Sequence, residues 1–296
     1  MPPSEGHVLT NDGVQLFFRK LGTGPQTVII PNSVHMFESF KGLADHRTVI
    51  FFDLRNRGAS DSVSDRSKLS RGIHHDVDDL EAVRRHFELN KVDVIGHSYL
   101  GLMVILYALK YPQHVNRVVQ IGPAQPNATT QYPAHLTGAD ETFAAFVSKL
   151  AELRNAERPK DPKLACGDFW ELLKVLMVAN PADARKILWT PCDYPNEWSM
   201  SHWTENILPS ILPLRFAPED VARITSPVLT IHGARDRQAP YGGGRDWALM
   251  LPNARLVTVE NAAHVPWIEA PEKVFGGIET FLDGAWPEAA KTLYRT

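Results

Sequence analysis

A serine, an aspartate and a histidine each follow an apolar run of β type, and together they could carry out nucleophilic acyl transfer. The three residues are Ser98, Asp236 and His264, and the runs are Val92 to Gly96, Val228 to His232 and Arg255 to Val259. In such a set the serine hydroxyl attacks a carbonyl carbon, the histidine takes its proton, and the aspartate orients the imidazole. The spacing therefore predicts catalytic roles for all three, with no metal and no organic cofactor.

The residues around Ser98 predict a tight turn from a strand into a helix. Gly96 lets the backbone turn sharply, and the residues from Ser98 to Tyr111 are apolar nearly all round, which indicates a buried helix. A helix N-terminus presents free N–H groups and a partial positive charge. The N–H of Tyr99 is therefore expected to donate to an oxyanion on Ser98.

The elements that must position these residues alternate between strands and helices. Further β-type runs are Val14 to Phe18, Thr27 to Pro31, Thr48 to Asp53 and Val118 to Gly122. Helical spacing of apolar residues marks Asp76 to Leu89 and Glu272 to Leu282. This alternation predicts an α/β fold with a mostly parallel sheet and helices on both faces.

The segment from 124 to 216 has a different pattern. It contains helical runs at Phe143 to Leu153 and Phe169 to Val178, broken by prolines, and no strand of the kind seen elsewhere. We expect a helical cap at 124–216 on a core made of 1–123 and 217–296. Four tryptophans lie in this segment, and they either form an apolar underside or fill the cap's own core. They are Trp170, Trp189, Trp198 and Trp203.

Composition excludes several classes of function. The formal net charge is −3, which gives no electrostatic footprint for nucleic acid or an anionic membrane. The longest apolar stretch near the middle, Leu100 to Leu109, is too short to cross a bilayer. Cys166 and Cys192 are too few for a disulfide framework or a zinc site, and we interpret them as small apolar cap residues. A cytoplasmic protein acting on a small molecule is expected, and no oligomeric state is indicated.

Four motifs in this order resemble the α/β-hydrolase superfamily over nearly the whole chain. They are Gly96-His97-Ser98, His232-Gly233 through Asp236, Ala263-His264-Val265-Pro266, and the turn Phe52 to Asp61. The resemblance implies an eight-stranded, mostly parallel sheet with helices on both faces and an inserted cap. It also implies a serine esterase or a relative of the prolyl iminopeptidases.

Two positions depart from the family pattern. The usual elbow has glycine two places after the serine, where this chain has Leu100, with Gly101 one residue later. The family's frequent His-Gly pair is replaced by Pro31-Asn32. Aligning these pairs makes the Ser33 N–H the second oxyanion donor, with Val34 as the alternative. Asn32, His35 and Phe37 would then lie at the entrance of the site.

The main prediction is a serine hydrolase of carboxylic esters, lactones included. The alternative is an aminopeptidase, because the stretch from Cys192 to Trp198 is similar to the lid of prolyl-iminopeptidase-like relatives. An aminopeptidase needs acids to hold a free amine, and Asp193, Glu197 and Glu205 are available. The cap residues expected to contact a substrate are Glu197, Trp198, Trp203 and Glu205. A ligand-binding member that turns over slowly or not at all stays open, as do carbon–carbon bond hydrolysis and perhydrolysis by the same triad.

Overall fold

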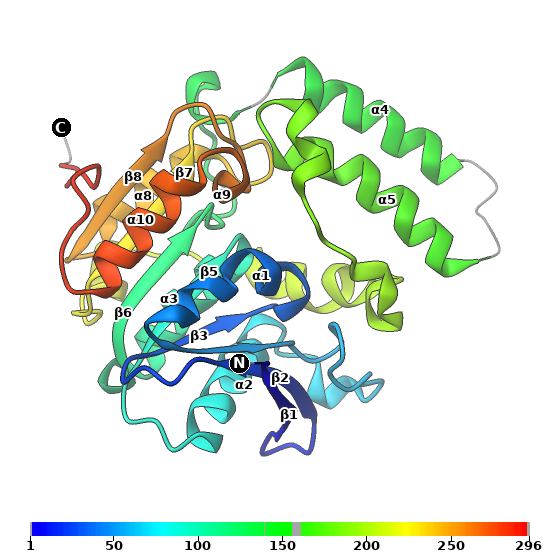
Figure 1. The fold of residues 1–296 in the computed structure, drawn as a ribbon. Coiled ribbons are helices and arrows are strands. Elements are labelled where there is room, and N and C mark those ends of the chain that lie inside the picture. The colour runs from blue at the N-terminus through cyan, green and yellow to red at the C-terminus, as the bar shows by residue number, and fades with distance from the viewer. Residues whose placement is uncertain (1, 139, 156–160, 295–296) are drawn as a thin grey trace.

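One eight-stranded sheet runs through the protein (Figure 1). The computed structural model describes residues 2–138, 140–155 and 161–294. The strands are β1 Ser4–Leu9, β2 Gln15–Leu21, β3 Thr27–Pro31, β4 Thr48–Phe52, β5 Val92–His97, β6 Val115–Ile121, β7 Val228–Gly233 and β8 Ala254–Val259. They lie in the order β1-β2-β4-β3-β5-β6-β7-β8. The β1–β2 and β2–β4 pairs are antiparallel and all other pairs are parallel, so the predicted sheet is confirmed.

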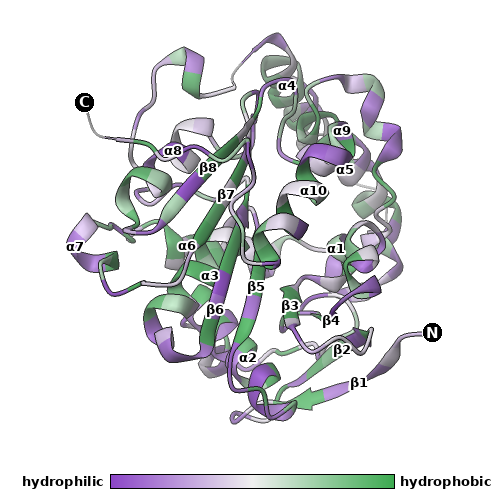
Figure 2. Cartoon of the chain, turned by 60° about the vertical axis from the view of Figure 1, so that its left-hand side comes forward, coloured by the Kyte–Doolittle hydropathy of each residue, from purple (hydrophilic) through white to green (hydrophobic). Residues whose placement is uncertain are grey.

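Helices cover both faces of the sheet because its central strands are apolar on both sides. Every residue of β4, β5 and β7 is buried, as a parallel sheet between two helical layers requires. On one face the core includes side chains from α2 Ile73–His86, α3 Tyr99–Lys110 and α8 Tyr241–Met250. On the other face it includes α1 Ser33–Phe40 and α10 Pro271–Leu282. Figure 2 shows the middle strands largely in the hydrophobic colour.

Most predicted elements are present within a few residues of their expected ends, but β1 is absent from the prediction. Its sequence, SEGHVL, buries only Val8, because β1 lies at the edge of the sheet and pairs with β2 alone. The remaining short helical elements are η1 Lys41–Asp45, η2 Arg66–Lys68, η3 Pro112–His114, α7 Pro218–Val221 and α9 Pro266–Glu269. None of the helices in the described ranges has the length and hydropathy that crossing a bilayer needs.

The described parts of the segment between β6 and β7 consist of helices joined by loops. The segment contains η4 Ala134–Leu136, α4 Glu141–Asn155, α5 Pro162–Met177, η5 Pro181–Lys186, η6 Pro191–Asp193, η7 Pro195–Glu197, η8 Trp203–Ile207 and α6 Leu208–Ile211. α4 packs against α5, and both stand to one side of the sheet (Figure 1, green). An isolated bridge joins Asn127 to Arg215, so the two ends of the segment lie together. The division into core and cap stays a prediction.

Candidate active site

Ser98 lies at a strained turn between β5 and α3. Its φ of 60° and ψ of −129° are values that residues other than glycine rarely adopt. Gly96 makes the turn possible, because a Cβ atom there would lie 2.1 Å from the carbonyl oxygen of Leu100. The structure therefore has the tight strand-to-helix turn that the sequence predicts.

The turn forms although Leu100 stands where the family pattern has glycine, and glycine comes one residue later, at Gly101. Leu100 is only 2% exposed and belongs to the core, so its side chain is accommodated. Gly101 lies where the helix meets the loop after β6, and a Cβ atom there would come within 2.9 Å of Pro123 Cβ. The close contact that needs glycine has moved one residue along the helix.

Asp236 and His264 come together at the ends of β7 and β8. His264 Nδ1 lies 2.8 Å from Asp236 Oδ2, and both side chains are buried. Asp236 Oδ1 accepts the backbone N–H groups of Gln238 and Ala239 at 2.8 and 2.9 Å. Burial would raise the pKa of Asp236, but the two histidines that contact it, His264 foremost, hold that pKa well below its usual range. The carboxylate is therefore ionised and fixed in one orientation.

A second histidine supports this carboxylate, and the sequence analysis assigned it no role. His232 Nε2 lies 3.1 Å from Asp236 Oδ2 and 3.0 Å from the carbonyl oxygen of Ala239. Because a carbonyl only accepts, Nε2 carries the proton and donates to both oxygens. Gly244 leaves room for the ring, since a Cβ atom there would lie 2.2 Å from His232 Nδ1.

Ser98 and His264 line the same cavity, which has a volume of about 130 Å³. His97 supports the histidine loop from below: its Nε2 donates to the carbonyl oxygen of His264 over 2.9 Å. Burial and the neighbouring His264 lower the pKa of His97 well below its usual value, so this ring stays neutral. The cavity is thus lined by the Ser98 hydroxyl and the His264 imidazole, and this imidazole is hydrogen-bonded to the Asp236 carboxylate.

The loop after β3 begins with a left-handed residue, Asn32. Asn32 adopts φ 69° and ψ 60°, a left-handed conformation that asparagine tolerates better than most residues. It therefore takes the backbone role of the glycine it replaces. The Val34 N–H donates to Asp53 Oδ1 over 3.1 Å and is not available to a substrate. This engagement leaves the Ser33 N–H as the candidate second donor.

The cavity has two sides, which we call the floor and the roof. The floor comes from the ends of the sheet strands and from the loops and helices that follow them, and it consists of Asn32, His35, Asn56, Arg57, His97, Ser98, Tyr99, Leu100 and His264. The roof comes from the segment between β6 and β7 and consists of Trp170, Met177, Trp189, Asn196, Glu197, Ser199, Met200, His202, Trp203 and Ile207. The predicted contacts at Asn32, His35, Glu197 and Trp203 are thus part of its lining.

Three residues predicted to contact substrate lie elsewhere. The Phe37 ring packs against Phe51, with ring centroids 5.2 Å apart, because the turn of α1 directs it to the sheet. The Trp198 Nε1 donates to the carbonyl oxygen of Cys192 over 2.8 Å. Glu205 is exposed and lies at a separate surface hollow. These three residues therefore lie outside the cavity lining.

Arg57 and Glu197 form an ion pair on the cavity wall that the sequence analysis missed. Arg57 Nε donates to Glu197 Oε1 over 2.7 Å, and the Gly58 N–H donates to the same oxygen over 3.0 Å. Burial would raise the pKa of Glu197, but Arg57 lowers it below its usual value. No local sequence pattern connects positions 57 and 197, so only the folded chain reveals the pair.

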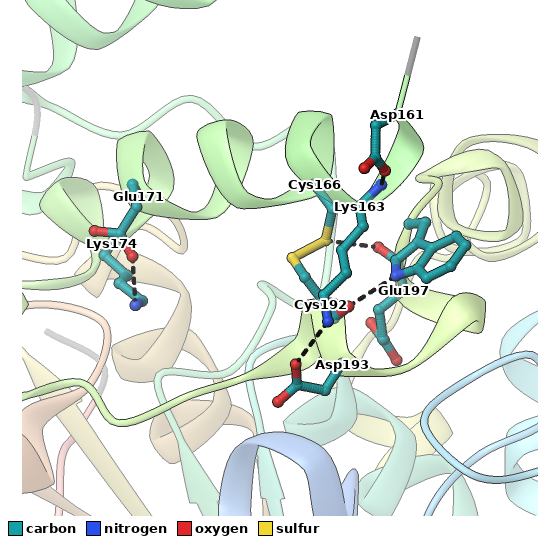
Figure 3. The surroundings of a disulfide bond; sticks show 9 residues. Asp161, Lys163, Cys166, Glu171, Lys174, Cys192, Asp193 and Glu197 are labelled. Carbon is teal, nitrogen blue, oxygen red and sulfur yellow. Dashed lines mark hydrogen bonds and ion pairs between the residues drawn. A yellow bond between two sulfur atoms is a disulfide. The ribbon is translucent and has the colours of Figure 1, made fainter. Parts of the chain in front are cut away.

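The two cysteines form a disulfide in the roof segment (Figure 3). Cys166 lies on α5 and Cys192 on η6; their Cα atoms are 5.8 Å apart, and the two residues are separated by 26 in the sequence. The interpretation of both as separate small apolar residues is wrong, because η6 folds back against α5. Disulfides are rare in cytosolic proteins. The bond therefore does not favour the predicted cytoplasmic location, which stays a prediction.

Comparison with known proteins identifies the family. A family model described as the alpha/beta hydrolase fold matches residues 30–271. The chain belongs to the α/β-hydrolase family. This assignment agrees with the sheet order and with the turn at Ser98, and it confirms the resemblance inferred from the four motifs.

Individual members of the α/β-hydrolase family are similar over almost the whole chain. The proline iminopeptidase PfmaB of Pestalotiopsis fici is 26% identical, over 92% of this chain and 97% of that protein. The proline iminopeptidase of Heyndrickxia coagulans is 23% identical, over 95% and 99%. The solved structure of the esterase EaEST from Exiguobacterium antarcticum superposes with a TM-score of 0.72 at 17% identity, over 95% and 100%. The last likeness concerns the fold.

Proposed function

We propose that this α/β hydrolase cleaves carboxylic esters, lactones included, through an acyl-enzyme on Ser98. One observation carries the proposal: Ser98, at its strained turn, and His264, hydrogen-bonded to Asp236, line the same cavity. A hydroxyl beside an oriented imidazole is the arrangement that nucleophilic catalysis needs. The substrate is a small molecule, because the cavity is small.

In the proposed reaction His264 acts first as a base and then as an acid. Its Nδ1 is held by Asp236, so Nε2 takes the Ser98 proton while Oγ bonds to the carbonyl carbon. The carbonyl electrons move to the oxygen, which accepts the N–H groups of Tyr99 and Ser33. When the tetrahedral intermediate collapses, the alcohol leaves with the proton from Nε2. A water activated by the same nitrogen then releases the acid.

Residues 124–216 act in this proposal as a cap over the catalytic residues. All roof residues come from this segment, and three of its tryptophans are among them. An apolar roof excludes water and binds the hydrocarbon part of a substrate. The cap would thus determine which esters are bound, and the core would carry out the chemical step.

The distribution of acids favours esters over peptides with a free amine. An aminopeptidase must hold a protonated amine, and Glu197 is the only one of the three proposed acids that lines the cavity. Its charge is already balanced by Arg57. Asp193 is exposed and pairs with Lys163, and Glu205 is exposed outside the cavity.

An aminopeptidase is the second candidate, because the two curated relatives described above are proline iminopeptidases. If it were correct, proline would be released from an N-terminal prolyl amide, and Glu197→Gln would lower that rate by at least tenfold. The same substitution would have no comparable effect on a neutral ester, since no amine is bound there. Absence of proline release with retained ester turnover would reject this candidate.

Turnover of 4-nitrophenyl butyrate by wild type and Ser98→Ala tests the main proposal. We expect Ser98→Ala to lower kcat by at least about 10³-fold, as loss of a triad nucleophile does. Ser201→Ala is the matched control, because Ser201 is exposed and its side chain lies outside the cavity lining. Equal turnover by wild type and Ser98→Ala would reject the acyl-enzyme.

A further inference from the structure

Arg57 is a cation on the wall of the cavity that Ser98 and His264 line. Its side chain is 17% exposed, and its Nε edge is held by Glu197. A guanidinium has five N–H donors, and the ion pair with Glu197 uses one of them. The hydroxyl of Tyr99 also interacts with the guanidinium. Burial raises the pKa of this hydroxyl above its usual value, and Arg57 offsets only part of that rise. That hydroxyl is a neutral oxygen.

Arg55, two residues earlier, shows how an arginine with a structural role is satisfied in this protein. Its Nε and Nη2 bond to both oxygens of Asp79 at 2.9 and 2.5 Å. Its Nη1 bonds to Asp12 over 2.8 Å and also to the carbonyl oxygen of Lys68. In the described part of the chain, Arg57 has one carboxylate partner, bound through one oxygen. The Nη end of Arg57 therefore has donors left for a ligand.

The other charges near the cavity leave room for an anion. Glu197 is the only carboxylate among the described lining residues. Burial, followed by the charge of Arg57, lowers the pKa of His35 to about 3 and that of His202 to about 4. Both rings are neutral at pH 7, so Arg57 and Glu197 balance each other. The buried carboxylate of Asp53 also interacts with Arg57, but it accepts the N–H groups of Val34 and Ala59 and does not line the cavity. An ammonium group would meet Arg57 in this cavity.

We propose that Arg57 binds a carboxylate on the substrate, so that the preferred esters carry a second, free acid group. The inference rests on the proposed ester hydrolysis and names its substrate class. Carboxylate oxygens match the two Nη groups of a guanidinium in a bidentate pair. The cavity volume, about 130 Å³, is close to the ~150 Å³ of a cavity that admits benzene. Half-esters of short dicarboxylic acids are therefore the expected class.

Two isosteric esters test this preference. Monomethyl glutarate carries the free carboxylate, and methyl 5-amino-5-oxopentanoate replaces it with a neutral amide. A hydrogen bond to a charged group changes affinity by about 10- to 100-fold. We expect wild type to show kcat/KM at least tenfold higher for monomethyl glutarate, with hydrolysis followed by chromatographic detection of methanol.

The variant for this test is Arg57→Gln combined with Glu197→Gln, because Arg57→Gln alone would leave Glu197 buried without a partner. We expect the ratio of the two kcat/KM values to fall to within threefold of unity in the double variant. The ratio is informative even if overall activity changes. Arg66→Gln is the control, since Arg66 is a cation near the same loop that lies outside the cavity lining, and it should keep the wild-type ratio.

Each outcome bears on a separate claim. A wild-type ratio near or below one, or an unchanged ratio in the double variant, overturns the inference while ester hydrolysis by Ser98 stands. If wild type hydrolyses 4-nitrophenyl butyrate but neither glutarate ester, the inferred substrate class is overturned while ester hydrolysis stands. If 4-nitrophenyl butyrate is not hydrolysed either, ester hydrolysis fails, and binding of glutarate to Ser98→Ala decides the role of Arg57. Quenching of tryptophan fluorescence reports that binding, because Trp170, Trp189 and Trp203 line the cavity. Loss of that binding when Arg57→Gln and Glu197→Gln are added to Ser98→Ala supports a carboxylate site at Arg57, and absent or unchanged binding overturns it.

Discussion

The floor and the roof of the cavity are held in place by different means. In the floor, Ser98 and Asn32 each adopt a left-handed φ directly after a parallel strand, at 60° and 69°. The roof segment contains four helical elements that begin with proline, α5, η5, η6 and η7, and one disulfide joins α5 to η6. Groups that must be oriented for chemistry are thus fixed by the backbone at strand ends. Groups that contact the rest of a substrate depend on side-chain attachments.

The main attachment of roof to floor is the loop after β4. Asn196 Nδ2 donates to the carbonyl oxygens of Gly58 and Ser60 at 3.1 and 2.7 Å, next to the ion pair of Glu197 with Arg57. Arg55 anchors the same loop to α2 through Asp79. One loop therefore connects the roof to the core and lines the cavity.

The largest effect on stability is expected from Arg55→Met. This change would leave Asp79, which is 0% exposed, without its partner. Removing one member of a buried ion pair costs about 3–5 kcal/mol, and urea unfolding would measure the loss. The kcat/KM ratio of the two glutarate esters should stay as in wild type, because Arg55 does not line the cavity.

The double change Arg55→Met and Asp79→Leu is the control for this prediction. Replacing both charges with apolar groups of similar size should recover most of the lost stability. A loss below about 1 kcal/mol for Arg55→Met alone would contradict the distinction between a bracing Arg55 and a ligand-binding Arg57. So would a changed ester ratio in either variant.

The sequence predicts the floor well because its signals are local. Ser98, Asp236 and His264 each follow an apolar run by a few residues, and strand ends in a parallel sheet meet at one edge. Asp236 and His264 are indeed hydrogen-bonded, and His264 shares a cavity with Ser98. The sheet itself is predictable for the same reason, except at β1, where only one residue is buried.

The roof is harder to predict because its contacts join distant parts of the chain. Cys166 and Cys192 meet only after η6 has folded against α5. Trp198 was expected to contact substrate and instead donates to the carbonyl oxygen of Cys192. Arg57 belongs to the floor, yet its partner Glu197 comes from the roof, 140 positions away. Sequence spacing gives no information on such pairs.

A middle-sized effect is expected from the disulfide. Closing a loop of this length stabilises a fold by about 2–4 kcal/mol. In the double variant Cys166→Ala and Cys192→Ala, amide hydrogen exchange in α5 should speed up, whereas the amides of β5 and β7 should keep their protection. Labelling of Ser98 by a fluorophosphonate should persist, because none of the hydrogen bonds described for Ser98, Asp236 and His264 involves either cysteine.

Reductant provides the control for the disulfide. Wild type treated with dithiothreitol should exchange like the double variant, and the double variant itself should not respond. Equal loss of protection in α5 and in β5 would show that roof and floor unfold as one unit, contrary to the proposed difference between them.

The smallest effect is expected at the junction of the two sides, where His35 of the floor packs on Trp170 and Trp189 of the roof with ring centroids 4.9 and 4.8 Å apart. Burial lowers the pKa of His35 to about 3, against an ordinary value of about 6.5. The unfolded chain therefore binds a proton below pH 6.5 that the folded chain does not, so stability falls as the pH falls towards 3. For one such group the loss from pH 7 to pH 5.5 is about 1 kcal/mol. Urea unfolding at pH 7 and at pH 5.5 gives the fall in the free energy of unfolding between the two pH values. This fall should be smaller by about 1 kcal/mol in His35→Gln than in wild type. An equal fall in the two proteins would mean that His35 is protonated inside the fold.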